Sequence, residues 1–286
     1  WLAVGVPTVP RARGERYLLH SLQSVARELP LDPHDVFHGS VVVLVVNMHG
    51  RGHDAFDVAE KLYAGGPLGA FFEFHTSRWS STSNVRGRDS GSANEPGWKV
   101  RKQTRDLVAL LHIARGKAQY FLFMEDDVLL CPHGLTTVRY VLNRVSLDDA
   151  NWFAIRASFG MNGIFVRDAD LLHLADYLWQ HQARRPPDHL VVEWYAGETN
   201  ESARYRGRRQ HYGFRYNIFH HVGSTSTLRY QRRAPETPTC YQPLIPPVVF
   251  QVEAHNPHWC RGDDLTPCLR TRDPPMNFAA LLDPPR

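Results

Sequence analysis

The sequence has no apolar run long enough to cross a membrane. Its longest run, Val41 to Val46, has the length of a strand, whereas a membrane helix needs about 20 apolar residues. No secretory leader is recognisable either, because the chain opens at Trp1, directly before a strand-like segment. We therefore expect any membrane anchor or targeting segment to lie outside these 286 residues.

Two kinds of binding motif are also missing. The phosphate-binding pattern GxxxxGK[ST] does not occur, which argues against a P-loop phosphotransferase or phosphohydrolase. The net charge is only +4, and the clearest basic run, 204–209, is interrupted by Tyr205 and Gly207. Because nucleic-acid-binding domains carry a concentrated basic face, we expect no nucleic-acid partner and interpret this run as a solvated loop.

Cysteine is scarce, and its distribution is uneven. The four cysteines are Cys131, Cys240, Cys260 and Cys268, three of them in the last part of the chain. Clustered cysteines in a loop-rich segment indicate disulfides formed in an oxidising compartment. Zinc binding is the alternative, because His255 and His258 lie nearby, although there is no CxxC pair. We predict at least one disulfide, without being able to assign the pairs.

The first 230 residues alternate strand-like and helix-like segments. Strands are expected at 2–6, 41–46, 71–74, 120–124, 152–157 and 213–219, and helices near 18–29, at 54–63, at 98–115, and after Pro132, Arg167 and Asp188. The run at 41–46 is apolar throughout, which is typical of a strand buried on both faces of a parallel sheet. This alternation predicts an α/β fold with a mostly parallel, doubly wound sheet. Ligands of such sheets bind at the carboxyl ends of the strands.

Two segments interrupt this alternation. Residues 76–97 are rich in Ser, Gly and Arg, which predicts a long loop that is mobile until a ligand orders it. From about Ala234, a Pro- and Cys-rich sequence replaces the strands and helices. We therefore expect one main domain at 1–233 and a tail, 234–286, packed on that domain.

The sharpest local feature is an acidic cluster at the end of the strand at 120–124, formed by Glu125, Asp126 and Asp127. Adjacent carboxylates repel one another unless a cation neutralises them. Carboxylate oxygens prefer Mg²⁺ or Mn²⁺, and such an ion can stabilise a departing diphosphate. The alternative is a solvated turn that caps the next helix. The position at a strand end favours the metal site.

Three further residues are candidates for chemistry. His221 follows the late strand in IFHHVGSTST, a position compatible with a ligand or with a structural role. Asp188 opens a helix after two prolines, where a plain N-cap is the alternative. Glu193 lies five residues further along the same helix, about 140° around its axis. The two carboxylates are therefore not expected to face the same hydroxyl group, and we favour Asp188.

Six segments taken together resemble a known family. They are VGVPTVPR (4–11), WKVRKQTRD (98–106), YFLFMEDDV (120–128), WFAIRASFGMNGIF (152–165), PPDHLVVEW (186–194) and FRYNIFHHVGSTSTL (214–228). In order and spacing they resemble the animal N-acetylglucosaminyltransferase IV enzymes, which add branching GlcNAc to N-glycans. They are more distantly similar to the GalNAc transferase that modifies GPI anchors. The resemblance covers about residues 2–229.

This resemblance implies a GT-A fold and an inverting transferase that uses Mn²⁺ or Mg²⁺ and a UDP-sugar in the Golgi or ER lumen. Asp127 and His221 would hold the metal, Asp188 would be the catalytic base, and Glu193 is the second carboxyl candidate on that helix. The positions expected to contact the donor are Pro7, Thr8, Arg11, Asn47, Lys102, Gln103, Asp106, Glu125 and Asp126. The acceptor would be a glycan or glycoconjugate.

Three departures from the family leave the specificity open. Arg156 stands where the branching enzymes have a Glu, close to the expected acceptor site. The Cys- and Pro-rich tail replaces their C-terminal lectin-like module, and the loop at 76–97 is particular to this chain. We expect GlcNAc as the transferred sugar. GalNAc, another hexose, or a non-catalytic glycan-binding role are the alternatives.

Overall fold

The computed structural model describes residues 1–11, 13–35, 37–77, 96–223, 237–269 and 275–276. Most of the loop that the sequence predicts at 76–97 lies outside these ranges. Within the described part of the chain, no helix is long and apolar enough to cross a bilayer.

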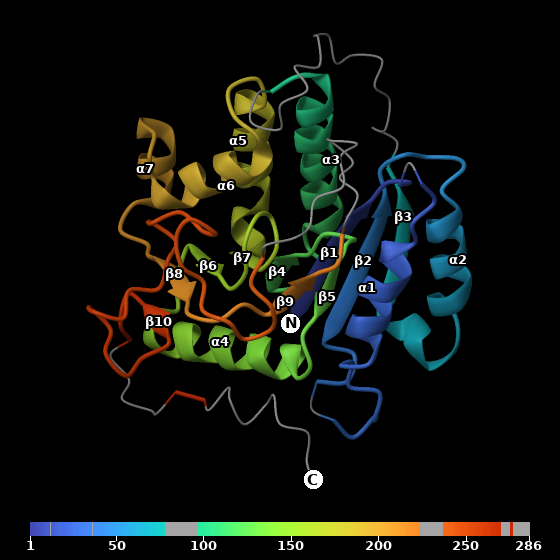
Figure 1. The fold of residues 1–286 in the computed structure, drawn as a ribbon, viewed down its shortest axis with the longest axis horizontal. Helices are drawn as coiled ribbons and strands as arrows, with labels where there is room; N and C mark the ends of the chain where they lie inside the picture. Colours follow the sequence, from blue (N-terminus) through green and yellow to red (C-terminus); the bar gives the residue numbers. More distant parts are fainter. Residues whose placement is uncertain (12, 36, 78–95, 224–236, 270–274, 277–286) are drawn as a thin grey trace.

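One eight-stranded sheet forms the centre of the protein, with the strand order β10-β8-β6-β7-β4-β1-β2-β3 (Figure 1). Its strands are β1 (Leu2–Thr8), β2 (Val41–Asn47), β3 (Phe72–Thr76), β4 (Tyr120–Phe123), β6 (Ala154–Arg156), β7 (Ile164–Arg167), β8 (His211–Phe214) and β10 (Leu265–Thr266). A second, two-stranded sheet pairs β5 (Val128–Leu130) with β9 (Phe219–His221). The helices are α1 (Tyr17–Ala26), α2 (Asp54–Tyr63), α3 (Trp98–Ala114), α4 (Gly134–Asp148), α5 (Leu171–His181), α6 (Pro187–Ala196) and α7 (Asn200–Arg206).

Most strands of the large sheet run in one direction. β1 pairs in parallel with both β2 and β4, β2 with β3, and β6 with β8. Only β7 and β10 run against their neighbours. The carboxyl ends of β1, β2 and β4 therefore meet at one edge of the sheet, where the sequence predicts the binding site.

The two faces of the sheet carry separate cores, because successive side chains of a strand point to opposite sides. On β4, Leu122 packs with the cluster that contains α1, α2 and α4. Its neighbours Phe121 and Phe123 pack with the cluster that contains α3, α5 and α6. Helices thus cover both faces (Figure 1), and the predicted α/β class with a mostly parallel, doubly wound sheet is confirmed.

The late strand expected at 213–219 is instead two strands in different sheets, β8 and β9. Asn217, which is fully buried between them, explains the break. Its amide donates hydrogen bonds to the carbonyls of Pro238 (2.8 Å) and Thr239 (3.2 Å), and its Oδ1 accepts one from Ser158 (2.7 Å). A buried amide has to be hydrogen-bonded, so the chain turns inward here and leaves the sheet.

The tail is attached to the main domain along one edge (Figure 1). Its strand β10 pairs with β8, and its Asp264 accepts a hydrogen bond from Arg144 on α4 (3.2 Å). One disulfide joins Cys131 to Cys240, and the other joins Cys260 to Cys268. The expected disulfides are confirmed, and no cysteine is left for the zinc alternative.

The two disulfides differ in the length of chain that they close, with separations of 109 and 8 residues. Replacing both Cys131 and Cys240 by Ala is expected to lower the free energy of unfolding by about 4–5 kcal/mol, against about 2–3 kcal/mol for the Cys260/Cys268 pair. The reason is that the longer loop restricts the unfolded chain more. Denaturant unfolding of the two variants measures the difference, and equal losses would contradict this account.

Candidate active site

Asp126 is held at the carboxyl ends of β1 and β4. The two strands pair in register, with Gly5 opposite Phe123, so the residues that follow Phe123 lie beside Thr8. The Thr8 hydroxyl donates a 2.6 Å hydrogen bond to the Asp126 carboxylate. The backbone carbonyl of Asp126 accepts a second hydrogen bond from Ser21 on α1 (2.9 Å). These bonds fix the acidic cluster at the edge of the sheet.

Arg11 supplies positive charge to this cluster. Its guanidinium forms a close ion pair with Asp126 and lies 3.3 Å from Asp127. Burial alone would lower the pKa of Arg11, but the two carboxylates raise it above its ordinary value, and the side chain stays cationic. The guanidinium thus contacts two of the three carboxyl groups of the cluster.

The small sheet brings His221 to Asp127. In the pairing of β5 with β9, Val128 stands opposite His221, and the imidazole Nε2 lies 3.6 Å from the Asp127 carboxylate. The backbone N–H groups of Val222 and Gly223 donate to the Asp127 carbonyl at 2.9 and 3.2 Å. A Cβ at position 223 would collide with the Asp127 side chain, which explains the glycine in the HVG segment.

The charges around Asp127 oppose the effect of its burial. Burial raises the pKa of Asp127, but the interactions with His221 and Arg11 outweigh it, and the pKa lies below its ordinary value. The same contact with Asp127 raises the pKa of His221 above its ordinary value. Asp127 is therefore an ionised carboxylate at neutral pH.

The site fits a metal ion that is shared with a bound diphosphate. Within the described ranges, no group of three His, Cys, Asp or Glu side chains is arranged to hold an ion by itself. Asp127 and His221 offer two donor atoms 3.6 Å apart, a spacing that one ion can bridge with bonds of about 2.0–2.2 Å. Mg²⁺-type ions are commonly held by one or two protein ligands and by substrate phosphates.

Glu125 is positioned by a residue that the sequence analysis did not single out. Asn162 donates to the Glu125 carboxylate (2.6 Å) and accepts from the Glu125 N–H (2.7 Å). Burial raises the pKa of Glu125 to about 7, and the charges of Asp127 and Asp188 add to this rise. Asp188 therefore lies close enough to Glu125 for its charge to act on that carboxyl group. In the sequence, the pair Asn162-Gly163 is typical of a turn, and this turn was the sign that could have drawn attention to Asn162.

Asp188 lies in the first turn of α6, which begins at Pro187. Its side chain is half-buried, and one carboxylate oxygen accepts a hydrogen bond from the N–H of His189 (3.0 Å). The unpaired N–H groups at a helix start stabilise a negative charge. The start of α6 is therefore a favourable place for the Asp188 carboxylate.

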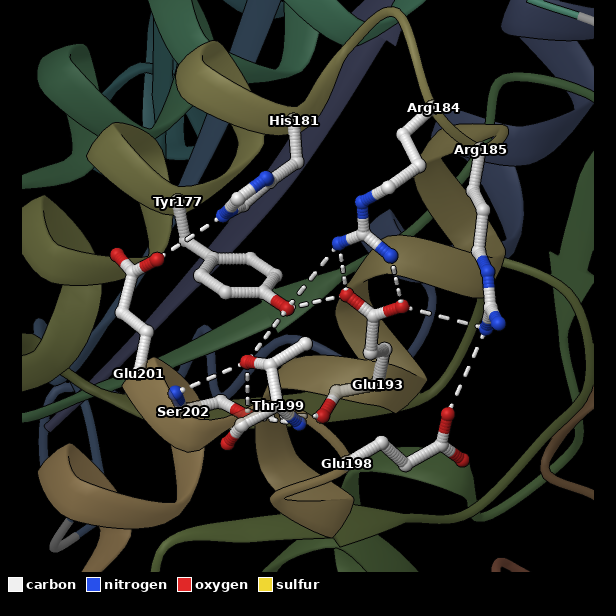
Figure 2. A network of polar contacts seen from close by, with 9 residues as sticks. All are labelled: Tyr177, His181, Arg184, Arg185, Glu193, Glu198, Thr199, Glu201 and Ser202. Carbon is white, nitrogen blue, oxygen red and sulfur yellow. Dashed lines mark hydrogen bonds and ion pairs between the residues drawn. The ribbon is translucent and has the colours of Figure 1, made fainter.

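Glu193, the other carboxyl candidate on α6, has a structural environment (Figure 2). It is 1% exposed and forms ion pairs with Arg184 and Arg185, the latter at 3.2 Å, and a close hydrogen bond from Tyr177. Burial raises the pKa of Glu193, but the hydrogen bonds from Arg184 and Tyr177 lower it by more, and the pKa lies below its ordinary value. Both carboxylate oxygens are thus engaged away from the acidic cluster, which does not favour Glu193 as a base.

The remaining donor candidates lie on β1, β2 and α3. The Lys102 ammonium donates to the carbonyl of Met48 (3.1 Å) and pairs with Asp106, and Met48 donates its N–H to Thr8 (2.9 Å). Burial raises the pKa of Asp106 to about 6. The Asn47 side chain is used within its own turn, where it accepts from His49 (2.9 Å). Pro7 and Gln103 are half-buried on β1 and α3.

His53 is a second residue that the sequence did not suggest. Its Nε2 lies 2.9 Å from the Thr8 hydroxyl, the group that holds Asp126. Burial lowers the pKa of His53 to about 4, so the ring is neutral. Because the Thr8 hydrogen is donated to Asp126, Nε2 is placed to donate its own hydrogen to the Thr8 oxygen. A lone His before a helix carries no pattern that distinguishes this role.

No known family model matches the chain. Individual curated proteins do. The chain is 29% identical over 138 residues to the mouse alpha-1,3-mannosyl-glycoprotein 4-beta-N-acetylglucosaminyltransferase-like protein MGAT4D, covering 46% of this chain and 36% of that protein. It is 25% identical to mouse alpha-1,3-mannosyl-glycoprotein 4-beta-N-acetylglucosaminyltransferase C, and the match covers 80% of this chain and 46% of that enzyme. It is also 25% identical to the human B enzyme, covering 79% and 42%.

Solved structures of low identity overlap with the chain as well. S. aureus TarS 1-349 in complex with UDP-GlcNAc gives a TM-score of 0.37 at 14% identity, covering 64% of this chain and 54% of that one. A glycosyltransferase involved in glycosylation of the major capsid of PBCV-1 gives 0.38 at 12% identity, covering 73% and 80%.

The chain spans less than half the length of the curated relatives it matches. Within that span the similarity to the C and B enzymes covers about four fifths of the chain. The resemblance inferred from the motifs is therefore confirmed: the chain is similar in sequence to the alpha-1,3-mannosyl-glycoprotein 4-beta-N-acetylglucosaminyltransferases.

Proposed function

We propose that this chain is the GT-A catalytic part of an inverting glycosyltransferase that moves GlcNAc from a UDP-sugar donor to a glycan or glycoconjugate acceptor. The observation that carries the proposal is the assembly of Arg11, Asp127 and His221 at the strand ends of a chain similar to GlcNAc transferases. Transfer of GalNAc or of another hexose is the alternative within the same chemistry.

On the donor side, the proposal assigns Asp127 and His221 to a Mn²⁺ or Mg²⁺ ion. When bound, such an ion would neutralise the negative charge that develops on the leaving diphosphate. Arg11 pairs with both Asp126 and Asp127 and holds the two carboxyl groups together. Glu125, held by Asn162, is the carboxyl group available to hydrogen-bond hydroxyls of the donor.

On the acceptor side, Asp188 would act as the general base. The acceptor oxygen forms its bond to the anomeric carbon while the bond from that carbon to UDP breaks, and the hydroxyl proton passes to Asp188. The hydroxyl becomes acidic only as its oxygen attacks, so an ionised carboxylate is an adequate base. A single displacement from the face opposite UDP inverts the anomeric centre.

We further propose the lumen of the Golgi or the ER as the working compartment. The two disulfides support an oxidising environment, because thiols of cytosolic proteins are kept reduced. The proposal is consistent with a glycan acceptor.

Release of UDP from a panel of UDP-sugars is the test, with Mn²⁺, with Mg²⁺ and with EDTA. We expect turnover with UDP-GlcNAc and an acceptor glycan that is at least about 100-fold above the EDTA control. Preference for UDP-GalNAc would move the assignment to the alternative donor. Binding of the acceptor without turnover of any donor would indicate a non-catalytic glycan-binding protein instead.

A further inference from the structure

We propose that the tail is a working part of the active site, and that Glu253 in the tail is a positioning residue for sugar transfer. The tail here means its described residues, 237–269. It acts through the loop that joins β6 to β7, residues 157–163, which we call the β6–β7 loop. The inference rests on the proposed transferase function.

The first step is a buried ion pair between the tail and the sheet. Glu253 and Arg156 are each 3% exposed and form a close salt bridge. The Arg156 guanidinium also donates to the carbonyls of Gly160 (2.8 Å) and Asn162 (3.1 Å) in the β6–β7 loop. A buried guanidinium needs a partner charge, so Glu253 keeps Arg156 in the place from which it holds this loop.

The second step leads from the loop to the acidic cluster. Asn162, whose carbonyl is held by Arg156, makes the two hydrogen bonds with Glu125 described above. Glu253, Arg156, Asn162 and Glu125 thus form an unbroken series of direct contacts from the tail to the candidate donor site.

A separate, apolar contact reaches the other side of the site. Phe159 of the β6–β7 loop packs against the small tail cluster of Leu244, Val249 and Ala254. Its ring also meets the imidazole of His221 edge to face, with centroids 6.4 Å apart. The loop therefore touches the tail on one side and both Glu125 and His221 on the other.

Glu253 is well suited to this role because its own position is strongly determined. One carboxylate oxygen accepts from Arg156 and from the hydroxyl of Tyr195 on α6, and the other accepts from the N–H of Phe250 (3.1 Å). Tyr195 belongs to the helix that begins with Asp188. The same carboxylate therefore contacts the sheet, the tail and the helix of the candidate base.

These contacts explain what the arginine at position 156 does in this chain. The sequence suggested that this side chain would lie near the acceptor. In the structure it is buried and directed to the β6–β7 loop and to Glu253 in the tail. A positive charge at 156 and a negative charge at 253 are therefore features of this chain that depend on each other.

The test is the exchange Glu253→Gln, with Asp264→Asn as the matched control. Asp264 is an equally buried tail carboxylate, bonded to Arg144 and Tyr140, but it does not contact the β6–β7 loop among the described residues. We expect Glu253→Gln to lower kcat at least about 10-fold, since small misplacements of reacting groups are costly, while Asp264→Asn lowers stability only.

A double-mutant cycle separates positioning from a general loss of stability. If Glu253 acts through Asn162, the pair Glu253→Gln and Asn162→Ala should lose little more kcat than the larger single change. Asp264→Asn and Asn162→Ala should combine multiplicatively. Multiplicative losses in both cycles, or a folded Glu253→Gln protein with unchanged kcat, would overturn the inference.

Two further measurements test the positioning role if Glu253→Gln does not fold or if the wild-type protein shows no transfer. If Glu253→Gln does not fold, Glu253→Asp retains the charge with a shorter side chain, and wild-type kcat in that variant would count against the proposal. The side-chain amide signal of Asn162 in ¹⁵N NMR does not depend on activity. It should shift in the Glu253 variants and not in Asp264→Asn. Because this signal can be measured without turnover, a wild-type protein without transferase activity would contradict only the proposed function. An unmoved signal would sink the positioning role.

Discussion

Replacing Asp188 by Asn is expected to lower the rate of sugar transfer by about 10²–10⁴-fold, the usual contribution of a general base. The amide is nearly the same size as the carboxylate but cannot accept the hydroxyl proton. Affinity for UDP and for the metal should change little, because Asp188 acts on the acceptor. Single-turnover transfer and calorimetric UDP binding measure the two effects separately.

Glu193→Gln is the matched comparison on the same helix. Glu193 is paired with Arg184 and Tyr177 (Figure 2), so its loss should lower the free energy of unfolding by a few kcal/mol, as expected when one partner of a buried pair is removed. Its effect on kcat should be small once the protein is folded. If Glu193→Gln abolished transfer and Asp188→Asn did not, the assignment of the base would have to be reversed.

Replacing Asp127 by Asn is expected to weaken Mn²⁺-dependent UDP binding by at least about 100-fold, since loss of even an outer contact of a metal site costs 10–100-fold. The exchange removes an ionised ligand beside His221. It also removes the contacts with Arg11 and His221 that hold the pKa of Asp127 below its ordinary value, so we expect a modest loss in the free energy of unfolding at neutral pH, where Asp127 is ionised.

Calorimetry with and without EDTA measures this effect. Chelation should bring the wild-type protein to the affinity of Asp127→Asn and should leave the variant unchanged. Asp170→Asn is the control, because Asp170 is a buried carboxylate that is ion-paired with Arg209 (2.7 Å) and lies outside the cluster. Unaltered metal-dependent binding in Asp127→Asn would show that the metal is held elsewhere.

The local pattern of the sequence was sufficient for most of the secondary structure. The strand expected at 41–46 is β2, at Val41–Asn47. The helices expected at 54–63 and 98–115 are α2 and α3, at Asp54–Tyr63 and Trp98–Ala114. Such segments are predictable because their apolar periodicity is set by neighbours in the chain. The strand break after Phe214 was not predictable in this way, because it depends on the contacts of Asn217 with residues about 20 positions away.

By itself, the sequence determined which residues gather at the strand ends. Parallel strands align their carboxyl ends whatever the loops between them do, so the acidic cluster and Thr8 were expected at one edge of the sheet. That β1 and β4 are neighbours was decided by the tertiary structure. Only the tertiary structure decided the partners: which cysteines pair, that Glu193 faces Arg184, and that Arg156 meets Glu253 across 97 residues. A buried charge requires an opposite one nearby, but nothing local in the sequence states which distant residue provides it.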